Sequence, residues 1–338
     1  MLMSTCPGLD GLHATGADSR GVLVSRRGWW LFAAMSLIWG IPYLLIKVAD
    51  SGVAPPVLVL ARVTIGAALL VPIAIRRREL TPLLPYWRWL ILFALVEIVA
   101  PWLLLSEAET RLSSSLSGLL IASVPILVAV FGLISGGQDR PGPVRWTGLL
   151  VGLGGVALLV VSGGANGNVG SVIEVLAVAV CYSIGPLIAA RKLSELPSLG
   201  MTAACLAFAA IIYAPIAAVT WPHAVPAAKV LASLAALGVI STAVAFILFF
   251  ALIAEAGPAR ATVITYVNPA VAVVLGVLVL GERLTDQMAI AFVLILGGSV
   301  LATRAAGQRA RGGGDGSEHE PETAAPAQYQ HARPAGPD

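Results

Sequence analysis

Residues 230–253 read VLASLAALGVISTAVAFILFFALI and contain no charged side chain. A helix needs about 20 mostly apolar residues to cross the hydrocarbon core of a membrane. A helix is also the conformation in which such a segment satisfies its own backbone hydrogen bonds in lipid. This stretch therefore predicts a transmembrane helix.

Nine further stretches of the same kind lie on either side of it. With the first, they predict an all-α integral membrane protein that has ten transmembrane helices. In chain order, the nine stretches are residues 29–48, 54–75, 87–105, 112–134, 144–161, 169–190, 199–220, 258–280 and 287–303.

The composition of the chain agrees with this class. Of its 338 residues, 58% are hydrophobic and 12% are charged, whereas soluble domains have about 25% charged residues. So much apolar surface cannot be buried inside a water-soluble protein of this size. A soluble enzyme, a nucleic-acid-binding protein and a disordered scaffold are therefore excluded. The net charge of +3 also forms no long basic stripe that would suggest nucleic acid.

The cysteines and histidines give no sign of a cofactor or a catalytic site. Cys6, Cys181 and Cys205 lie far apart and have no paired spacing. Three of the four histidines lie in the terminal segments, and His223 stands alone in an expected outer loop. We expect no metal, no cofactor and no enzymatic activity.

The chain ends and the basic residues predict the orientation. Residues 1–28 are charged and lack the apolar core of a signal peptide, which predicts a cytoplasmic N-terminal segment. Residues 305–338 are rich in Gly, Ala and Pro and predict a disordered cytoplasmic tail. If the N-terminus is cytoplasmic, 16 of the 21 Lys and Arg residues fall on the inner side, as the positive-inside rule predicts. Both termini are therefore expected in the cytoplasm, with the protein in the plasma (inner) membrane.

The two halves of the chain resemble each other at an offset of 143–144 residues. The alternative is chance similarity between apolar sequences, but collinear prolines and glycines favour a repeat. It divides the chain into five-helix repeats at residues 29–161 and 169–304. An odd number of spans inverts the second repeat relative to the first, as in many secondary transporters. The matching positions are residues 71–74 with 214–217, Pro125 with Pro269, Gly132 with Gly276, Gly137 with Gly281, and Gly154-Gly155 with Gly297-Gly298.

Three segments carry a resemblance to a known family. Residues 256–287 read AGPARATVITYVNPAVAVVLGVLVLGERLTDQ, residues 107–133 read EAETRLSSSLSGLLIASVPILVAVFGL, and the first helix contains Trp39-Gly40. In this order they resemble the EamA-type carriers of the drug/metabolite transporter superfamily, over residues 29–304. The resemblance implies a ten-helix carrier, usually an exporter of small metabolites or amphiphilic compounds. One departure is that Gly-Glu-Arg-Leu at 281–284 is matched in the first half by Gly-Gln-Asp-Arg at 137–140.

Two charged residues fall near the middle of the predicted membrane spans. At a rise of about 1.5 Å per residue, Glu97 lies about 15 Å from the inner end of its helix, and Arg62 about 12 Å from the outer end of its own. A charge at this depth costs roughly 2.5–3.5 kcal/mol and should face the bundle interior or a water-filled cavity. We predict that Glu97 couples transport to protons or binds an ammonium group. The alternative is a structural ion pair, or a protonated Glu97 bonded to backbone.

Arg62 has three possible roles. It could offer two donors to a substrate carboxylate, pair with Glu97, or snorkel to the outer interface. The repeat partner of Glu97 is Ser241, which is polar but uncharged.

Other residues complete the candidate site, and Trp39, Tyr182 and Asn268 are expected at the same depth as Glu97 and Arg62. Proline frees a backbone carbonyl and kinks a helix, so Pro125 and Pro269 predict kinks. The freed carbonyls and the Asn268 amide could line a substrate cavity, or the kinks could serve packing alone. Aromatic side chains could hold organic substrates by stacking or cation–π contacts, although they too could be packing residues. The candidate substrate-binding or coupling residues are Trp39, Tyr43, Arg62, Glu97, Tyr182, Ser241, Tyr266 and Asn268.

The helix ends give weaker signals. Glu107, Glu109 and Arg111 predict a solvated outer loop, with an outer gate at Glu107 as the alternative. Gly281-Glu282 predicts the capped end of the ninth helix at the membrane edge. The glycine pairs of the fifth and tenth helices allow close helix approach, which predicts peripheral struts or the face of a homodimer.

Together these features predict a secondary transporter that moves small metabolites or amphiphilic compounds, such as amino acids or drugs, by alternating access. We expect export coupled to protons, with a small-molecule substrate and the lipid bilayer as partners. Import by the same fold is the alternative. A channel would need a polar filter, and a membrane enzyme would need a metal cluster or a nucleophile–base pair, and the spans contain neither pattern.

Overall fold

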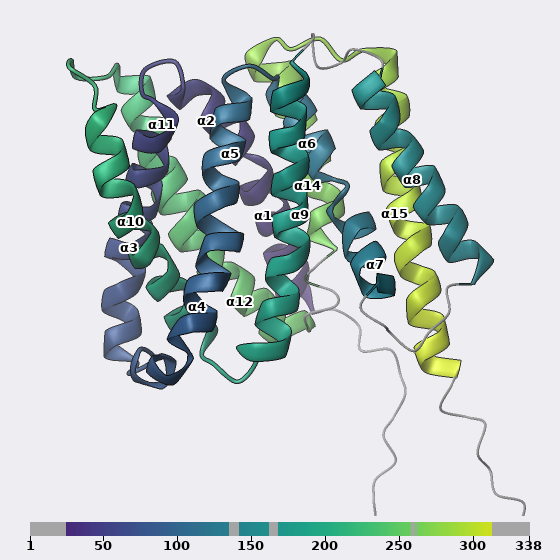
Figure 1. The fold of residues 1–338 in the computed structure, drawn as a ribbon, viewed down its shortest axis with the longest axis horizontal. Helices are drawn as coiled ribbons and strands as arrows, with labels where there is room; N and C mark the ends of the chain where they lie inside the picture. The colour runs from purple at the N-terminus through teal and green to yellow at the C-terminus, as the bar shows by residue number, and fades with distance from the viewer. Residues whose placement is uncertain (1–24, 135–141, 162–167, 258–260, 262, 313–338) are drawn as a thin grey trace, which may run out of the picture. The chain divides into compact units, whose positions relative to one another are not determined.

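The computed structural model describes residues 25–134, 142–161, 168–257, 261 and 263–312, and this part of the chain is helical and has no strand (Figure 1). Seven helical stretches are long and apolar enough to cross a membrane. Three shorter apolar helices cover Trp146–Val160, Ile264–Leu280 and Asp286–Ala302. The prediction of an all-α membrane protein is confirmed.

The helices of the first half cover the first five predicted stretches, of which the first and the fourth are each divided into two helices. Pro42 and Pro55 each begin a helix, where the missing N–H of proline is harmless. Of the short elements, η1 is a 3₁₀ turn and η2 a π-helical turn. The elements are α1 (Arg26–Gly40), α2 (Pro42–Ala49), α3 (Pro55–Arg76), η1 (Thr81–Tyr86), α4 (Trp87–Ala94), η2 (Leu95–Val99), α5 (Ala100–Glu109), α6 (Ser114–Ile121), α7 (Val124–Ile134) and α8 (Pro143–Val161).

The helices of the second half follow the same order, and η3 is a second π-helical turn. The last helix continues past residue 303, where the sequence predicted its end, so that residues 305–312 of the predicted tail are helical. Residues 1–24, 137–140 and 313–338 lie outside the described residues. The elements are α9 (Val169–Lys192), α10 (Ser198–Val219), α11 (Ala228–Gly238), η3 (Val239–Val244), α12 (Ala245–Ala256), α14 (Ile264–Leu280) and α15 (Asp286–Gly312).

The chain forms two compact units. The first contains residues 1–121 and 168–284, and the second contains residues 122–167 and 285–338. Each unit therefore combines segments from both halves of the sequence.

In the first unit, helices of one half pack on helices of the other. Helix α3 packs on α10, α5 on α9, and α6 on α14, while α1 contacts α12 and α2 contacts α11 (Figure 1). Gly66 and Gly118 allow close approach, because a Cβ added at either would press on Thr242 or Ala272 of the opposite half. The core of this unit thus lies between the two halves of the chain.

In the second unit, α8 packs along α15. Three glycines of α8 (Gly148, Gly152 and Gly155) and Gly298 of α15 have no room for a Cβ. Gly154 and Gly297 meet nothing within 4 Å. One member of each glycine pair therefore lies in the close contact between α8 and α15, and the other member does not. Small residues commonly allow such close packing between membrane helices.

The predicted fourth helix, residues 112–134, is interrupted. Helix α6 ends at Ile121 and α7 begins at Val124, so Pro125 lies in the first turn of a new helix. This corrects the expected single kinked helix: the helix breaks between Ile121 and Val124, and proline is tolerated in the first turn of the helix that follows. Pro269 lies inside α14, as predicted.

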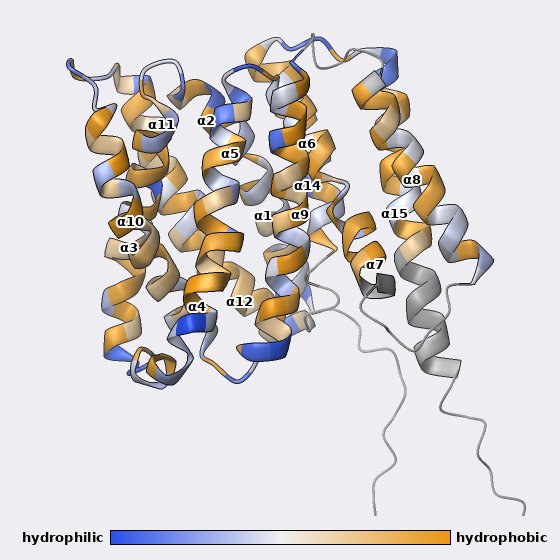
Figure 2. Ribbon diagram, in the orientation of Figure 1, coloured by the Kyte–Doolittle hydropathy of each residue, from blue (hydrophilic) through white to orange (hydrophobic). Residues whose placement is uncertain are grey.

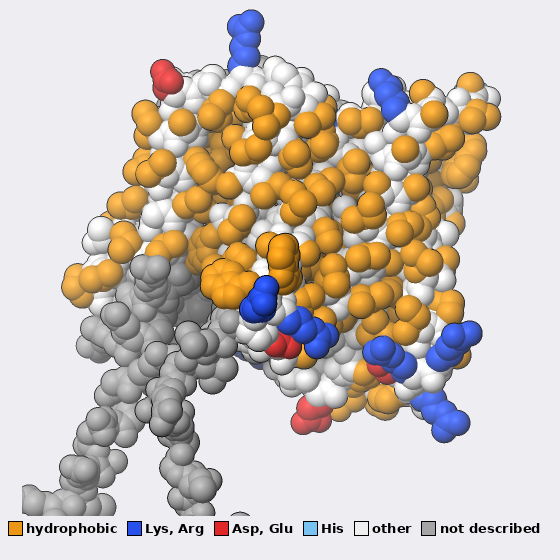
Figure 3. Space-filling view, turned by 180° about the vertical axis from the view of Figure 1, so that it is seen from behind, with side chains coloured by type: hydrophobic (Ala, Val, Ile, Leu, Met, Phe, Trp, Pro, Cys, Tyr) orange, Lys and Arg blue, Asp and Glu red, His pale blue; other side chains and the backbone are white. Residues whose placement is uncertain are grey.

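The surface is suited to lipid. Hydrophobic residues dominate the middle of the helices (Figure 2), and the charged side chains visible in Figure 3 lie mainly towards its upper and lower edges. Large apolar side chains are freely exposed, among them Leu278 at 76% and Ile211 at 72%. Such exposure in water would be unfavourable, since burial of apolar surface contributes about 25 cal/mol per Å².

Candidate functional site

The two π-helical turns lie at matching positions of the sequence repeat. Turn η2 begins at Leu95 and η3 at Val239, an offset of 144 residues. A π-helical turn inserts an extra residue into a helix and is frequent at functional sites. Glu97 lies in η2 and Ser241 in η3, so the candidates that the repeat paired share the same unusual backbone.

Glu97 reaches from η2 towards α9. A Cβ added at Gly185 of α9 would overlap the Glu97 carboxylate, so glycine is what leaves room for it. Its Oε2 atom is buried and has no hydrogen-bond partner among the described residues. The charge of Glu97 acts on Cys181 and Tyr182 of α9. The predicted alternative of a backbone-bonded or ion-paired Glu97 finds no support in these contacts.

Arg62 is buried at 8% exposure in α3. Its guanidinium carbon lies 3.7 Å from the centre of the Trp102 ring of α5. Its Nε donates to Thr242 Oγ1 at 3.0 Å, and this hydroxyl donates to the Leu237 carbonyl at 2.8 Å. The side chain therefore does not snorkel to the interface.

Arg62 and Glu97 also do not form the ion pair that the sequence allowed. No nitrogen of Arg62 lies within 4.0 Å of a carboxylate oxygen, since the ion pairs between described residues involve other side chains. The side-chain hydrogen bond that Arg62 makes to another described residue uses Nε.

Tyr43 and Tyr182 complete this group; the sequence placed Tyr182 at this depth, whereas Tyr43 was a candidate as an aromatic side chain. Both hydroxyls interact electrostatically with Arg62 and with each other, and the Tyr182 hydroxyl also interacts with Trp102. A polar group made of Glu97, Tyr182, Arg62 and Tyr43 thus lies inside an otherwise apolar helix bundle.

Trp39 and Asn268 belong to a different environment. The Trp39 ring packs on Phe249 and Phe246 of α12, with ring centres 4.7 and 5.9 Å apart. With its amide oriented to suit its neighbours, Asn268 donates to the carbonyls of Ser36 at 3.2 Å and Ile264 at 2.9 Å. Asn268 therefore ties α14 to α1.

Ser241 and Tyr266 are placed less fully. Ser241 is buried, and its hydroxyl has no partner among the described residues. Tyr266 is partly buried in the first turn of α14.

The expected solvated outer loop is wrong for Glu109. This residue ends α5, is fully buried, and has no hydrogen bond to its carboxylate among the described residues. Lys47 of α2 lies beside it and donates to the carbonyls of Glu109 and Leu112. Burial arises because α2 covers the end of α5, which sequence spacing alone does not indicate.

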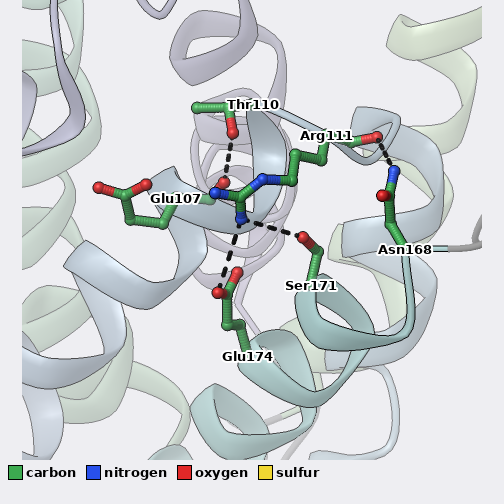
Figure 4. Close-up of polar contacts among 6 residues, drawn as sticks. All are labelled: Glu107, Thr110, Arg111, Asn168, Ser171 and Glu174. Atoms are coloured by element: carbon green, nitrogen blue, oxygen red, sulfur yellow. Dashed lines mark hydrogen bonds and ion pairs between the residues drawn. The ribbon is translucent and has the colours of Figure 1, made fainter.

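Arg111 fastens the turn between α5 and α6 to the start of α9 (Figure 4). Its Nη1 lies 3.7 Å from Glu174 Oε1 and 3.4 Å from Ser171 Oγ. Asn168 donates to the Arg111 carbonyl, and Thr110 donates to the Glu107 carbonyl. The Glu107 carboxylate points away from Arg111 in this view.

Glu282 caps a helix of the other half. Its carboxylate accepts from the backbone N–H groups of Ser114 and Ser115 at 2.7 and 2.9 Å, and from the Ser115 hydroxyl. Gly281 has a φ of 67°, and it ends α14 as expected for a C-terminal glycine. The acidic residue of the Gly-Glu-Arg-Leu motif therefore satisfies the free donors at the start of α6.

Sequence reasoning missed Trp102, Thr242 and Gly185. Thr242 adjoins Ser241, and Trp102 lies within the same span as Glu97, so both carried a weak signal. Gly185 carried none, because only the packing of α9 on η2 shows what it makes room for. Among the described residues, no group of three His, Cys, Asp or Glu side chains could hold a metal ion.

Two proteins with similar sequences are named as transporters. An inner membrane transporter of Escherichia coli K12, YedA, is 27% identical over 274 residues, which cover 80% of this chain and 88% of YedA. The transporter YvbV of Bacillus subtilis strain 168 is 25% identical, over 79% of this chain and 88% of YvbV. Both are named as uncharacterized. A crystal structure matches with a TM-score of 0.58 at 24% identity, over 83% of this chain and 99% of the other, and it shows the fold alone.

The EamA-like transporter family matches the chain twice, at residues 26–161 and 170–304. These matches cover most of both halves. The chain belongs to the EamA-like transporter family and is a membrane transporter.

Proposed function

We propose that this transporter is a proton-coupled exporter of small amphiphilic metabolites that carry an anionic group. Its ten apolar helices form two inverted five-helix repeats, with both termini in the cytoplasm. The two halves exchange inward-open and outward-open shapes around one site.

The helix contacts support the repeat. If the helices are counted as ten spans, the pairs in contact are second with seventh, fourth with ninth, and fifth with tenth. The third also packs on the sixth, and the first on the eighth. Exchanging the two halves maps the first three pairs onto themselves and converts the last two into each other. The matching turns η2 and η3 follow the same exchange.

The observation that carries the coupling is the Glu97 carboxylate beside Gly185, with Oε2 buried and unpartnered. A buried carboxyl without a partner favours its neutral form. A step that opens the site to water favours the ionised form. Such a residue therefore gains and loses a proton as the site changes its access.

Arg62 supports the anionic part of the substrate. Its planar guanidinium can donate two parallel hydrogen bonds to a carboxylate. Thr242 and Trp102 fix its orientation from two sides, and the Trp102, Tyr43 and Tyr182 rings offer apolar surface nearby. Export follows from the family resemblance in the sequence.

The proposal is tested by reconstitution into liposomes. Amino acids, other organic acids and organic cations are screened for flux with and without a pH gradient. We expect saturable flux of compounds that join an anionic group to an apolar body, driven by the gradient. Flux of cations alone, or flux indifferent to the gradient, would contradict the proposal.

The orientation is tested separately. A fluorescent reporter fused after Asp338 should fluoresce in cells only if this end is cytoplasmic. A reporter that is exported and dark would refute the proposed topology.

A further inference from the structure

A second buried carboxyl group lies at the end of α5, apart from Glu97. Glu109 is 0% exposed, and both of its carboxylate oxygens are buried without a hydrogen-bond partner among the described residues. An ionised carboxylate without hydrogen bonds is very costly in such a place. The residue therefore needs a cation or a proton.

Asp50 is the acid that acts most strongly on Glu109. It follows the last residue of α2, and both of its carboxylate oxygens are also buried and unpartnered. The pKa of Asp50 is raised to about 7, chiefly by burial; Lys47 opposes this rise and Glu107 contributes to it. Two acids that repel each other tend to share a proton, since both cannot be ionised cheaply.

Lys47 does not neutralise these acids by direct contact. Its ammonium group donates to the backbone carbonyls of Glu109 and Leu112, and it forms no ion pair within 4.0 Å with a described carboxylate. It binds the carboxyl-terminal end of α5, where a cation is favoured by the helix dipole.

The other charges around Glu109 do not remove the need for a proton. Glu282 is held by three hydrogen bonds at the start of α6, and its charge repels Glu109. Arg62 is attractive, but it forms no ion pair with Glu109 within 4.0 Å, since the ion pairs between described residues involve other side chains. The charged groups that act on Glu109 or Asp50 are Lys47, Asp50, Arg62, Glu107 and Glu282, and Glu109 itself acts on Tyr43.

We propose that Asp50 and Glu109 together form a proton-binding site, separate from Glu97, at the ends of α2 and α5. A metal ion is disfavoured there because no group of three potential ligands exists among the described residues. Asp50 lies at the partly exposed end of α2 and exchanges the proton with solvent, whereas Glu109 holds it inside the bundle.

The site is tested by infrared spectroscopy of the purified full chain in detergent, titrated from about pH 5 to about pH 9, around the usual range of a raised carboxyl group. A protonated carboxyl group has a C=O stretch that an ionised one lacks. We expect this band in the wild type near neutral pH. In Glu109→Gln, its intensity should fall by the contribution of one carboxyl group. The surface variant Glu195→Gln is the control and should leave the band unchanged.

Asp50→Asn gives a second test that does not depend on replacing a fully buried residue. Removal of its charge should lower the pH at which the Glu109 band disappears, because a repelling neighbour is lost. Glu97→Gln should remove the contribution of a different carboxyl group to the band. The losses in Glu97→Gln and Glu109→Gln should therefore add in the double variant. Because the protein is at equilibrium and transports nothing, the result is independent of the proposed transport function.

Three results would overturn the site. They are an unchanged band in Glu109→Gln, an unchanged titration in Asp50→Asn, and a band that titrates differently in sodium chloride and choline chloride. The last would assign the two carboxylates to a sodium ion.

Discussion

Glu97 and Glu282 are two carboxylates that each lie against a glycine, and they are used in opposite ways. A Cβ would overlap the Glu97 carboxylate at Gly185 of the neighbouring α9, and the Glu282 carboxylate at Gly276 of α14, the helix that precedes it. Glu282 accepts three hydrogen bonds from the start of α6, whereas Glu97 Oε2 accepts none. The Glu282 carboxylate is held in place by its hydrogen bonds, whereas we propose that the Glu97 carboxylate binds a proton.

The type of a residue and its distance from a helix end therefore do not decide its role. The hydrogen-bond partners of the side chain decide its role. A carboxylate at a helix N-terminus stabilises the fold through the free N–H groups and the helix dipole. A buried carboxylate without a partner is costly to ionise, which is why we propose that Glu97 binds a proton.

The largest expected effect is on Glu97. Replacement by Gln keeps the shape and removes the proton site, so accumulation driven by a pH gradient should fall at least about tenfold, the factor that corresponds to about 1.4 kcal/mol. Thermal stability should stay equal or rise. Flux into proteoliposomes is the measurement, with Glu107→Gln as the control. Unchanged gradient dependence in Glu97→Gln would place this carboxylate with Glu282 as structural.

The next effect concerns the anchor of Arg62. Thr242→Val removes the only side chain that accepts a hydrogen bond from Arg62 among the described residues. A hydrogen bond to a charged group contributes about 1.5–3 kcal/mol, so apparent substrate affinity should fall about tenfold.

The matched control for Thr242→Val is Thr202→Val, at another buried threonine whose hydroxyl donates to its own helix. Counterflow measures both variants. Equal losses would mean that Thr242 is a packing residue.

Alanine substitutions at Gly185 and Gly276 should distinguish the roles of Glu97 and Glu282 by their different effects on stability. Gly276→Ala would crowd Ser114, Ser115 and Glu282 at a fixed helix start, and overpacking costs about 1–3 kcal/mol. Gly185→Ala meets the end of a flexible side chain, so it should cost less stability and impair transport more. Denaturation and flux assays of both variants check this order, and the reverse order would refute the comparison.

Loss of the Glu282 cap should have a smaller effect. Glu282→Ala should lower stability by about 0.5–2 kcal/mol, the usual range for a helix cap, and leave the pH dependence of transport unchanged. Glu195→Ala is the exposed control. A changed pH dependence in Glu282→Ala would show that the cap also takes part in coupling.

The smallest effect is the pH dependence of stability at Asp50. Its pKa is raised from 3.8 to about 7, so the stabilisation from its bound proton is present at low pH and is lost as the pH rises from about 4 through about 7. Asp50→Asn should flatten this decline and raise the Tm above pH 7 by about 1–4 °C. Thermal unfolding in detergent at several pH values measures it, and parallel curves for both proteins would contradict the assignment.

Most of the fold was predictable, because each apolar stretch must be helical in lipid. The helix ends agree within a few residues in most of the described helices, but new helices start at Pro42 and at Val124 inside predicted stretches, and α15 runs on to Gly312. The central polar group was predictable in part, since Glu97, Arg62 and Tyr182 were expected at one depth. Depth carries no angular information, and so Trp39 and Asn268 were placed in the same group although they pack elsewhere.

What could not be predicted depends on contacts between distant segments. The burial of Glu109 needs α2 to cover the end of α5, and the role of Glu282 needs α6, which lies about 170 residues earlier in the chain. The π-helical turns have no known signal in these residues. The repeat did pair Glu97 with Ser241 correctly as positions on the same backbone feature.

Proton movement driven by the substrate is the most direct test of proton coupling at Glu97. Proteoliposomes that contain a pH-sensitive dye are given a substrate gradient without an initial pH difference. The account predicts an internal pH change with the wild type, and none with Glu97→Gln, although substrate counterflow persists in the variant. Equal pH changes with both proteins would contradict the account.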